Sequence, residues 1–176
     1  MTEHLLNEIN VDEILDREVE PYKGNAIVGR PTLKEVRNGY VQISIPLYYP
    51  ANGATLAREG WEALAQSVRN AYNNGLTNLG QLLDLRTFTA VWNVRPQWFT
   101  PEFVSELKSG RVDASEKTQY QINVSGLTKS FFQAIGLATV DFDNPEIVGS
   151  IVGFSNRKRK DDPTRLDISR FFPARF

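Results

Sequence analysis

The feature that most constrains the fold is the pattern that starts at position 26, where apolar and polar residues begin to alternate with the period of a half-buried β-strand. Residues 33–37 and 40–47 flank the dipeptide Asn38-Gly39. Both central residues of a type I′ turn need a positive φ, which asparagine and glycine tolerate better than other residues. The pattern therefore predicts a β-hairpin. The apolar face of its second strand consists of Val41, Ile43 and Ile45.

Four later segments alternate in the same way and are predicted as strands: residues 86–95, 120–124, 149–157 and 165–171. The last two are joined by a polar turn that contains lysine and arginine residues, so they predict a closing hairpin with a basic tip. Proline cannot donate a hydrogen bond to a neighbouring strand. We therefore expect Pro46 and Pro50 to end the strand that begins near Tyr40.

Segments with helical spacing of apolar residues separate these strands. Residues 55–72 carry the longest apolar stripe, and residues 100–109 begin with the N-cap threonine and first-turn proline of a shorter helix. A third helix is predicted over residues 128–135. Residues 110–118 are polar and predict a loop, whereas the leucine-rich stretch 76–85 fits either a short helix or a buried loop.

The order of these elements, a hairpin, an added strand, a helix and a closing hairpin, is that of an OB-type barrel. We therefore predict an α+β, strand-rich fold, an OB-like antiparallel β-barrel with inserted helices. It would form one domain over residues 24–176, with the helical insertion around 54–119. The same order is compatible with a generic α+β sandwich, because the order of strands in space cannot be read from this sequence.

Charge is distributed unevenly along the chain, although the formal net charge at pH 7 is only −1. Residues 1–20 hold seven acidic residues and one arginine, whereas the other 156 residues carry a net charge of +5. We predict that residues 1–23 form an acidic arm that docks on a partner or on the body of the protein. The basic body predicts binding of a polyanion, and charges that are merely solvated are the alternative.

Residue types that are missing exclude several classes of function. The sequence has no cysteine and one histidine, His4. This rules out disulfide scaffolds, cysteine zinc sites, iron–sulfur clusters, thiol nucleophiles and sites that need two histidines. The sequence contains neither a phosphate-loop motif nor a G-x-G-x-x-G motif after a strand. No cofactor is predicted, and we expect a protein that is not an enzyme.

Targeting signals are also missing from the sequence. No apolar run approaches the roughly 18 residues of a membrane span. The acidic N-terminus lacks the basic start of a signal peptide. We therefore expect no membrane partner and a cytoplasmic location, which would be the host cytoplasm if the protein is viral.

One carboxylate cluster, formed by Asp141, Asp143 and Glu146, has the residue types of a two-metal nuclease. No second carboxylate pair with a positioned lysine accompanies it in the sequence. The dipeptide Asn144-Pro145 within the cluster favours the start of a turn. A solvated turn is therefore the interpretation that we favour.

Basic residues interleaved with aromatic residues form the strongest functional pattern in the sequence. Single-stranded nucleic acid binds to this combination, because cations neutralise phosphates and exposed rings stack on bases of any sequence. Trp92, Phe131 and Phe154 have the periodicity of core residues and are expected to be buried. The candidate contact residues are Tyr48, Tyr49, Arg95, Trp98, Tyr120, Arg157, Lys158, Arg159, Lys160, Arg165 and Arg170.

The closing third of the chain carries a family resemblance, mainly over residues 127–173. The matching segments are 131–137 (FFQAIGL), 148–153 (VGSIVG) and 166–173 (LDISRFFP). They resemble segments of the bacteriophage single-stranded DNA-binding proteins of the OB-fold class, in which they build the last hairpin of the barrel. Many of those proteins end in an acidic tail that recruits replication partners. This chain ends in Arg175-Phe176 and carries its acidic residues at the front.

The residue pattern and the resemblance lead to one main hypothesis. We expect a protein that binds single-stranded DNA without sequence preference and supports phage-type replication or recombination. Residues 1–20 would compete with DNA or recruit a replication or recombination protein. The alternative is a viral structural or assembly subunit whose arm contacts a neighbouring subunit, and a nuclease at the carboxylate cluster is a third hypothesis. A homo-oligomer is compatible with the first two.

Overall fold

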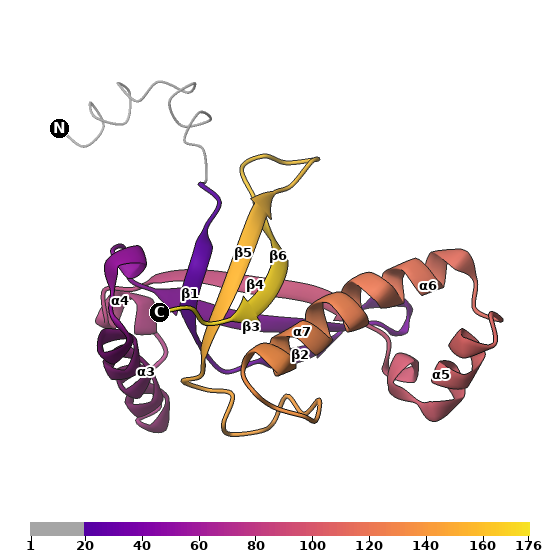
Figure 1. The fold of residues 1–176 in the computed structure, drawn as a ribbon, viewed down its shortest axis with the longest axis horizontal. Coiled ribbons are helices and arrows are strands. Elements are labelled where there is room, and N and C mark those ends of the chain that lie inside the picture. Colours follow the sequence, from indigo (N-terminus) through magenta and orange to yellow (C-terminus); the bar gives the residue numbers. More distant parts are fainter. Residues whose placement is uncertain (1–19) are drawn as a thin grey trace.

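The structure of the protein is a computed structural model, which describes residues 20–176. It has an α+β architecture in which six antiparallel strands form one sheet and helices pack against it (Figure 1). Residues 1–19, which make up most of the predicted acidic arm, lie outside the described part of the chain.

The strands are β1 (Lys23–Val28), β2 (Thr32–Glu35), β3 (Val41–Tyr49), β4 (Arg86–Val94), β5 (Ile151–Lys158) and β6 (Leu166–Pro173). The helices are α3 (Arg58–Asn73), α4 (Leu79–Leu82), α5 (Pro101–Lys108), α6 (Ala114–Tyr120) and α7 (Lys129–Ala134), with a π-helical segment (Gln121–Thr128) between α6 and α7.

Strands β1 and β2 follow each other along the same edge of β3. β2 pairs with residues 41–44 and β1 with residues 47–48, while β4 pairs with the whole opposite edge. Pro46 lies between the two pairings and accepts a hydrogen bond from Gly29 N at 2.8 Å. The N–H and C=O groups of one residue point to the same edge of an antiparallel strand. The edge at which Pro46 lacks an N–H donor is therefore the edge that faces the gap between β1 and β2. For this reason the prediction that Pro46 ends the strand is wrong, and β3 continues to the residue before Pro50.

The predicted hairpin turn between β2 and β3 is confirmed. Asn38 and Gly39 both have positive φ values, 64° and 74°, and Tyr40 N donates to the carbonyl oxygen of Arg37 across the turn. The predicted alternation of β3 and β4 is confirmed as well. The buried residues at alternate positions of these two strands are Ile43, Ile45, Leu47, Ala90, Trp92 and Val94.

The closing hairpin of β5 and β6 is confirmed, but the predicted closed barrel is wrong. β1 pairs with both β3 and β5, which gives the order β4–β3–β1–β5–β6, with β2 beside β1 on the edge of β3. Among the described strands β4 and β6 do not pair, so the sheet stays open between them. Aromatic rings fill the intervening space. The ring centroids of Trp92 and Phe171 lie 5.7 Å apart, and those of Phe88 and Phe154 lie 5.5 Å apart.

Residues 114–134 are helical throughout, because α6, the π-helical segment and α7 follow each other without a break (Figure 1). The predicted loop over residues 110–118 is therefore confirmed only for residues 110–113, and the prediction of a strand over 120–124 is wrong. The apolar stripe of this helix consists of Tyr120, Val124, Leu127 and Phe131. These residues have the four- and three-residue spacing of a helical face. Ile122, which suggested the alternation of a strand, is 52% exposed.

The predicted helices over residues 55–72 and 100–109 are confirmed to within a few residues of their ends, and the helix predicted over 128–135 is the last part of the helix that begins at Ala114. Thr100 Oγ1 accepts a hydrogen bond from Phe103 N at 3.3 Å and caps α5, and Gly136 has a φ of 79° just past α7. The leucine-rich stretch 76–85 contains the short helix α4. In the described part of the chain, no helix combines the length and the apolar character needed to cross a bilayer.

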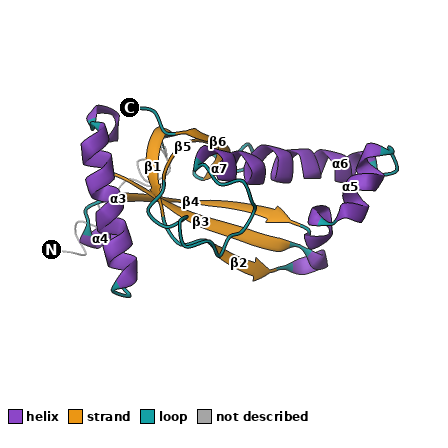
Figure 2. Ribbon diagram, turned by 60° about the horizontal axis from the view of Figure 1, so that its bottom comes forward, coloured by secondary structure: helices purple, strands orange, loops and turns teal. Residues whose placement is uncertain are grey.

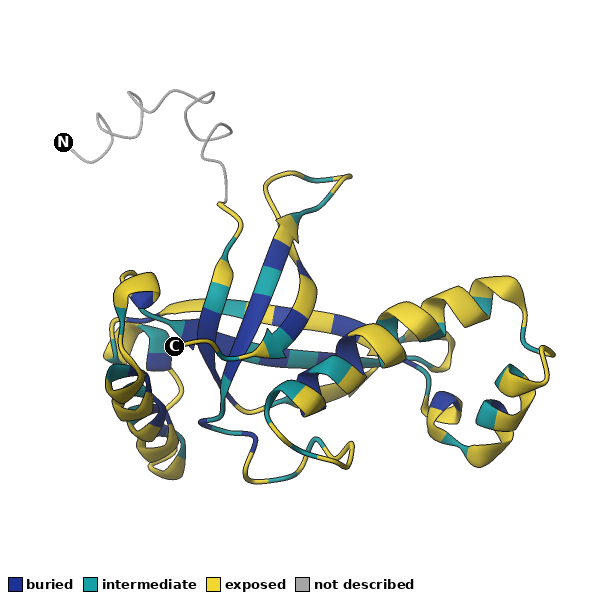
Figure 3. Ribbon diagram, viewed as in Figure 1, coloured by how far each residue is buried: buried dark blue, intermediate teal, exposed yellow. Residues whose placement is uncertain are grey.

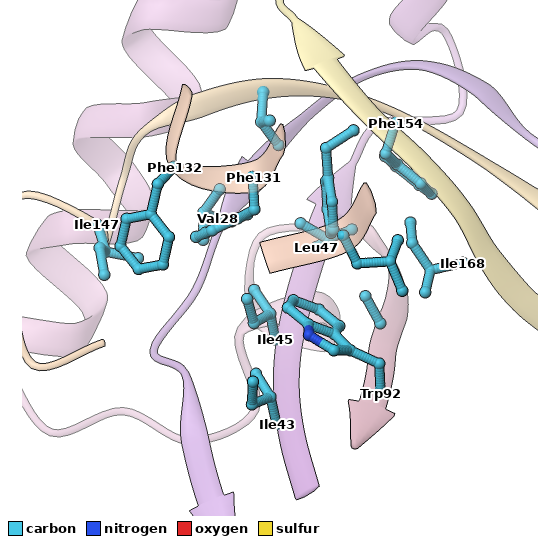
Figure 4. Packing of buried hydrophobic residues seen from close by; sticks show 14 of the residues in the cluster. Val28, Ile43, Ile45, Leu47, Trp92, Phe131, Phe132, Ile147, Phe154 and Ile168 are labelled. Carbon is cyan, nitrogen blue, oxygen red and sulfur yellow. The ribbon is translucent and has the colours of Figure 1, made fainter. Parts of the chain in front are cut away.

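Two apolar cores lie on opposite faces of the sheet. Figure 4 shows Ile43, Ile45 and Leu47 in a row along β3 in the larger core, which the π-helical segment and α7 cover. Trp92, Phe131 and Phe154 are buried in this core, as predicted. In the smaller core, residues of α3 and α4 pack against Ile27 of β1 and Tyr48 of β3. Figure 2 shows these two helices beside the sheet. Because Leu47 and Tyr48 are neighbours in a strand, they point to opposite faces and belong to different cores.

Candidate nucleic-acid interface

The structure does not bring the predicted contact residues together on one surface. Arg95, Trp98 and Tyr120 lie at the end of β4 that meets α5 and α6. Tyr48 lies under α3. The remaining residues lie on β5–β6 or, like Tyr49, at the end of β3, and Figure 3 shows the tip of the β5–β6 hairpin as mostly exposed.

The first group is a structural cluster rather than an open surface. Trp98 is only 1% exposed, and its Nε1 donates to Glu116 Oε1 at 3.2 Å. The same carboxylate lies 3.5 Å from Arg95 Nη1. Tyr120 is half-buried, with its ring centroid 6.1 Å from that of Trp98. The candidate contact residue Trp98 is therefore not an exposed ring, because α5 and α6 cover it and Glu116 neutralises the neighbouring cation.

The candidate contact residue Tyr48 is buried as well. Its side chain is 6% exposed, and its hydroxyl lies 3.0 Å from the hydroxyl of Tyr72 on α3. Burial and the hydrogen bond to Tyr72 raise the pKa of Tyr48 well above its usual value. Tyr48 is therefore part of the contact between α3 and the sheet.

Tyr49 is half-buried and stacks on Tyr22, with the ring centroids 4.0 Å apart and the planes inclined by 23°. Burial, with a smaller contribution from the neighbouring Tyr49, raises the pKa of Tyr22 to about 12. Burial also raises the pKa of Tyr49, and the Arg86 cation partly offsets this effect. The stacked pair forms a fixed aromatic wall at the start of β1.

One pocket lies on the Tyr49 side of this wall. It has a volume of about 600 Å³ and is lined by Tyr49, Arg86 and Arg165 together with the neighbouring apolar residues of β4 and β6. Tyr49 and Arg165 are the two predicted residues that the structure brings together here. Glu20 also lines this pocket, and it is the one carboxylate residue of the described chain that does so.

A second pocket, of about 330 Å³, lies on the Tyr22 side and has no acidic residue in its lining. Lys23, Arg175 and the rings of Phe172 and Phe176 line it. The guanidinium of Arg58 lies 4.5 Å from the centroid of the Phe176 ring, which is 54% exposed. We call the residues Tyr22, Lys23, Tyr49, Arg86, Arg165, Phe172, Arg175 and Phe176 the Tyr22–Tyr49 surface.

A buried side chain holds the last residues of the chain against this surface. Asn25, which is 8% exposed, donates to the carbonyl oxygen of Arg175 at 2.7 Å and accepts from Arg175 N at 2.9 Å. The ring of Phe172 lies so close to Gly153 that a Cβ there would meet it at 2.2 Å. The guanidinium groups of Arg170 and Arg175 lie 5.6 and 5.2 Å from the centroid of this ring. The basic and aromatic side chains are thus held in position by β1 and β5.

Ion pairs occupy part of the basic hairpin tip. Arg159 pairs with Asp161 at 3.0 Å and with Asp167 at 3.8 Å, and Arg165 Nε lies 3.4 Å from Asp162 Oδ2. Of the other predicted residues here, Arg157, Lys160 and Arg170 are exposed and Lys158 is half-buried. The tip therefore keeps a smaller positive charge than its sequence suggests.

Sequence reasoning missed several residues of the Tyr22–Tyr49 surface. Arg86 lies in a segment with no neighbouring basic run, so no local signal marks it. Arg175 and Phe172 were visible as part of a basic and aromatic C-terminal stretch. The pairing of β1 with β5 brings this stretch beside Tyr22. Because the two strands are far apart in the sequence, no pattern within either strand predicts this pairing.

The predicted carboxylate cluster forms a turn. Asp141 Oδ1 accepts a hydrogen bond from Asp143 N at 3.0 Å, and Asn144 Oδ1 accepts one from Glu146 N at 2.9 Å. These side chains cap backbone N–H groups of the loop before β5. Within residues 20–176, no group of three or more histidine, cysteine, aspartate and glutamate side chains is arranged to hold a metal ion.

Comparisons with known proteins add no relative to this picture. No protein-family model matches the chain, and searches of curated proteins and of solved structures gave no match. Function is therefore inferred from the chemistry of the surfaces described above.

Proposed function

We propose that the protein binds single-stranded DNA without sequence preference through the Tyr22–Tyr49 surface. One observation carries this proposal. The two pockets beside the Tyr22–Tyr49 stack are lined by four cationic residues and aromatic rings but by a single described carboxylate residue, Glu20. Cations would neutralise phosphates, and exposed rings such as Phe176 would stack on bases.

The strand order supports a relation to the OB barrel. If β1 and β2 count as one interrupted strand, the order β4–β3–β1–β5–β6 is that of an OB barrel opened between its third and last strands. In OB folds, oligonucleotides bind across the second and third strands and the loops that flank them, including the loop between the last two strands. Tyr49 and Arg86 lie at the ends of β3 and β4, and Arg165 lies in the loop between β5 and β6. The larger pocket thus combines the elements that bind nucleic acid in that fold.

The biological setting that we propose is phage-type replication or recombination, in which exposed single strands are covered without being cut. The protein would act without catalysis, and its acidic arm would recruit a partner or compete with DNA. Glu20, the first described residue of the chain, lines the same pocket as Arg86 and Arg165. The arm therefore joins the described part of the chain at a residue that lines the proposed DNA site.

The proposal is tested by fluorescence anisotropy with labelled mixed-sequence and poly(dT) oligonucleotides over a range of salt concentrations. We expect similar affinities for both sequences, weaker binding to duplex DNA, and a steep loss of affinity with salt. The double variant Arg86→Ala/Arg165→Ala should bind roughly 10-fold more weakly. The slope of log affinity against log salt should be smaller by about 1.4, the value for two lost phosphate contacts on a single strand.

A matched control is Arg111→Ala/Lys117→Ala, which removes two exposed cations near α5 and α6, away from the proposed surface. It should bind DNA like the wild type. Equal losses in the two double variants would show that only net charge matters, and the proposed surface would then be wrong. Absence of binding at low salt would overturn the function itself. In the same assay, deletion of residues 1–19 should tighten binding if the arm competes with DNA.

A further inference from the structure

A third pocket lies away from the Tyr22–Tyr49 surface and shares no residue with it. It has a volume of about 450 Å³ and is lined by residues from the end of α3, the link from β1 to β2, and the loop before β5. Figure 1 shows how the chain connects these three segments. Two arginines from different elements line it, Arg30 from the link and Arg69 from α3. Neither forms an ion pair with another described residue.

The Arg69 side chain is held in place by the chain segment that it crosses. Its Nη2 donates to the carbonyl oxygen of Gly149 at 3.2 Å, and its Nη1 donates to Gln66 Oε1 at 3.0 Å. Gly149 has a φ of +86°, and a Cβ at this position would lie 2.3 Å from Arg69 Cγ. The glycine is therefore what allows the arginine to lie across the loop.

The Arg30 side chain is positioned by an aromatic ring. Its guanidinium lies 5.2 Å from the centroid of the Tyr72 ring. The hydroxyl of Tyr72 is held by Tyr48 at 3.0 Å and lies over Gly29, where a Cβ would meet it at 2.4 Å. Stacking on a ring orients the planar donors of a guanidinium, which is a common arrangement in sites that bind phosphate.

The opposite wall of the pocket has a different chemistry. Phe142 is anchored in the larger core, with its ring centroid 5.0 Å from that of Phe132. The next residue, Asp143, is exposed and lines the pocket as its one described carboxylate residue. An ionised carboxylate accepts hydrogen bonds and repels anions. A ligand that fits both walls carries an anion at one end and hydrogen-bond donors at the other.

We propose that this pocket binds a nucleoside phosphate, with the phosphate between Arg30 and Arg69 and the base on the side of Phe142 and Asp143. Two guanidinium groups suit the oxygens of one phosphate. The volume is in the range of pockets that enclose small ligands. A base with an exocyclic amino group can donate to the Asp143 carboxylate. This site is separate from the proposed DNA surface and does not depend on it.

The same ligand chemistry has two sources, a free mononucleotide or the phosphorylated end of a strand. Isothermal titration calorimetry with deoxyadenosine 5′-monophosphate tests the first source. A comparison of 5′-phosphorylated and 5′-hydroxyl oligonucleotides tests the second source. Deoxyadenosine and inorganic phosphate, used alone, measure what each half of the ligand contributes.

We expect the wild type to bind the mononucleotide, or the phosphorylated end, at least about 10-fold more tightly than Arg30→Ala or Arg69→Ala does, since each variant removes a charged hydrogen bond. Arg30→Lys should bind with intermediate affinity because it keeps the charge without the planar donors. Asp143→Asn should weaken mononucleotide binding and strengthen binding of inorganic phosphate. Arg37→Ala removes an exposed arginine at the β2–β3 turn and is the matched control.

The proposal is overturned if the wild type binds neither ligand, or if Arg30→Ala binds them as tightly as the wild type. Arg30 is exposed, so this variant should remain folded, and circular dichroism checks that it does. The Arg86→Ala/Arg165→Ala variant should bind the mononucleotide normally. This result separates a failure of the pocket from a failure of the DNA surface.

Discussion

The two ends of the β3–β4 pair have similar residues but different roles. At one end Arg95, Trp98 and Tyr120 gather beside Glu116, and at the other Tyr22 and Tyr49 gather beside Arg86 and Arg165. At the first end, α5 and α6 cover the rings and a carboxylate pairs with the arginine. At the second end Arg165 lies 3.4 Å from Asp162, but the cations outnumber the carboxylates that line the pockets, and the pockets remain open. The comparison teaches that arginine and aromatic residues mark a binding surface only where no helix covers them and the cations outnumber the carboxylates.

The comparison predicts that the Trp98 cluster contributes to stability and the Tyr22–Tyr49 surface contributes to binding. The strongest test is Trp98→Ala. Removal of a fully buried tryptophan leaves a cavity and should lower the free energy of unfolding by about 3–5 kcal/mol. Urea denaturation measures this effect. Phe99→Ala is the control, because Phe99 is 42% exposed and its loss should cost far less.

The same variant also tests the binding half of the comparison. Where Trp98→Ala is still folded, at low temperature and without urea, it should bind single-stranded DNA as the wild type does. A loss of DNA affinity without a loss of stability would contradict the assignment of Trp98 to the structural cluster.

An intermediate effect is expected from Tyr22 at high pH. In the unfolded chain its phenol ionises near the ordinary pKa of 10.0, whereas in the folded state it stays protonated up to about pH 12. Between these values unfolding releases a proton, so stability should be complete below pH 10 and fall as the pH rises to 12. Tyr22→Phe removes this part of the pH dependence.

Denaturation at a series of alkaline pH values measures the effect, together with phenolate absorbance of the folded protein. Tyr22→Phe also loses the hydrogen bond from the hydroxyl to the Asn25 carbonyl oxygen, so it should be less stable than the wild type by about 1 kcal/mol at neutral pH. An unchanged alkaline slope in the variant would show that Tyr22 is less buried than the stacked geometry implies.

The smallest effect is expected at the hairpin tip. The variant Asp161→Asn/Asp167→Asn removes the two carboxylates that pair with Arg159. Exposed ion pairs contribute little, so urea denaturation should show no resolvable change in stability. If the tip contacts DNA, affinity at low salt should rise a few-fold, and this gain should disappear at high salt. Unchanged DNA affinity in this variant at low salt would separate the tip from the proposed surface.

Much of the sheet could be predicted from local patterns. The alternation of β3 and β4 and the Asn38-Gly39 turn were sufficient, because one buried face fixes the period and a type I′ turn needs those residue types. The strand prediction at 120–124 failed, because Tyr120 and Val124 fit both periods over so short a window, and the apolar Ile122 between them, which is exposed, completed a false alternation. The longer stripe that extends to Phe131 decides in favour of the helix.

The candidate surface could be predicted only in part. The basic and aromatic composition of the last 26 residues was visible in the sequence, and so was the contribution of Tyr49. Tyr48 and Trp98 have the same residue types as surface rings but are buried by α3 and by α5–α6. Whether a ring is covered depends on which helix packs over it, and that contact joins residues far apart in the chain.

The sequence by itself determined strands β2 to β6, the turn between β2 and β3 and the uneven charge, because these depend on residues close together in the chain. Tertiary structure alone decided three further features. It left the sheet open between β4 and β6, brought β1 beside β5, and paired Arg95 with Glu116 while Arg86 stayed in a pocket. The physical reason is that burial and charge pairing are properties of neighbours in space, which an alternating pattern does not specify.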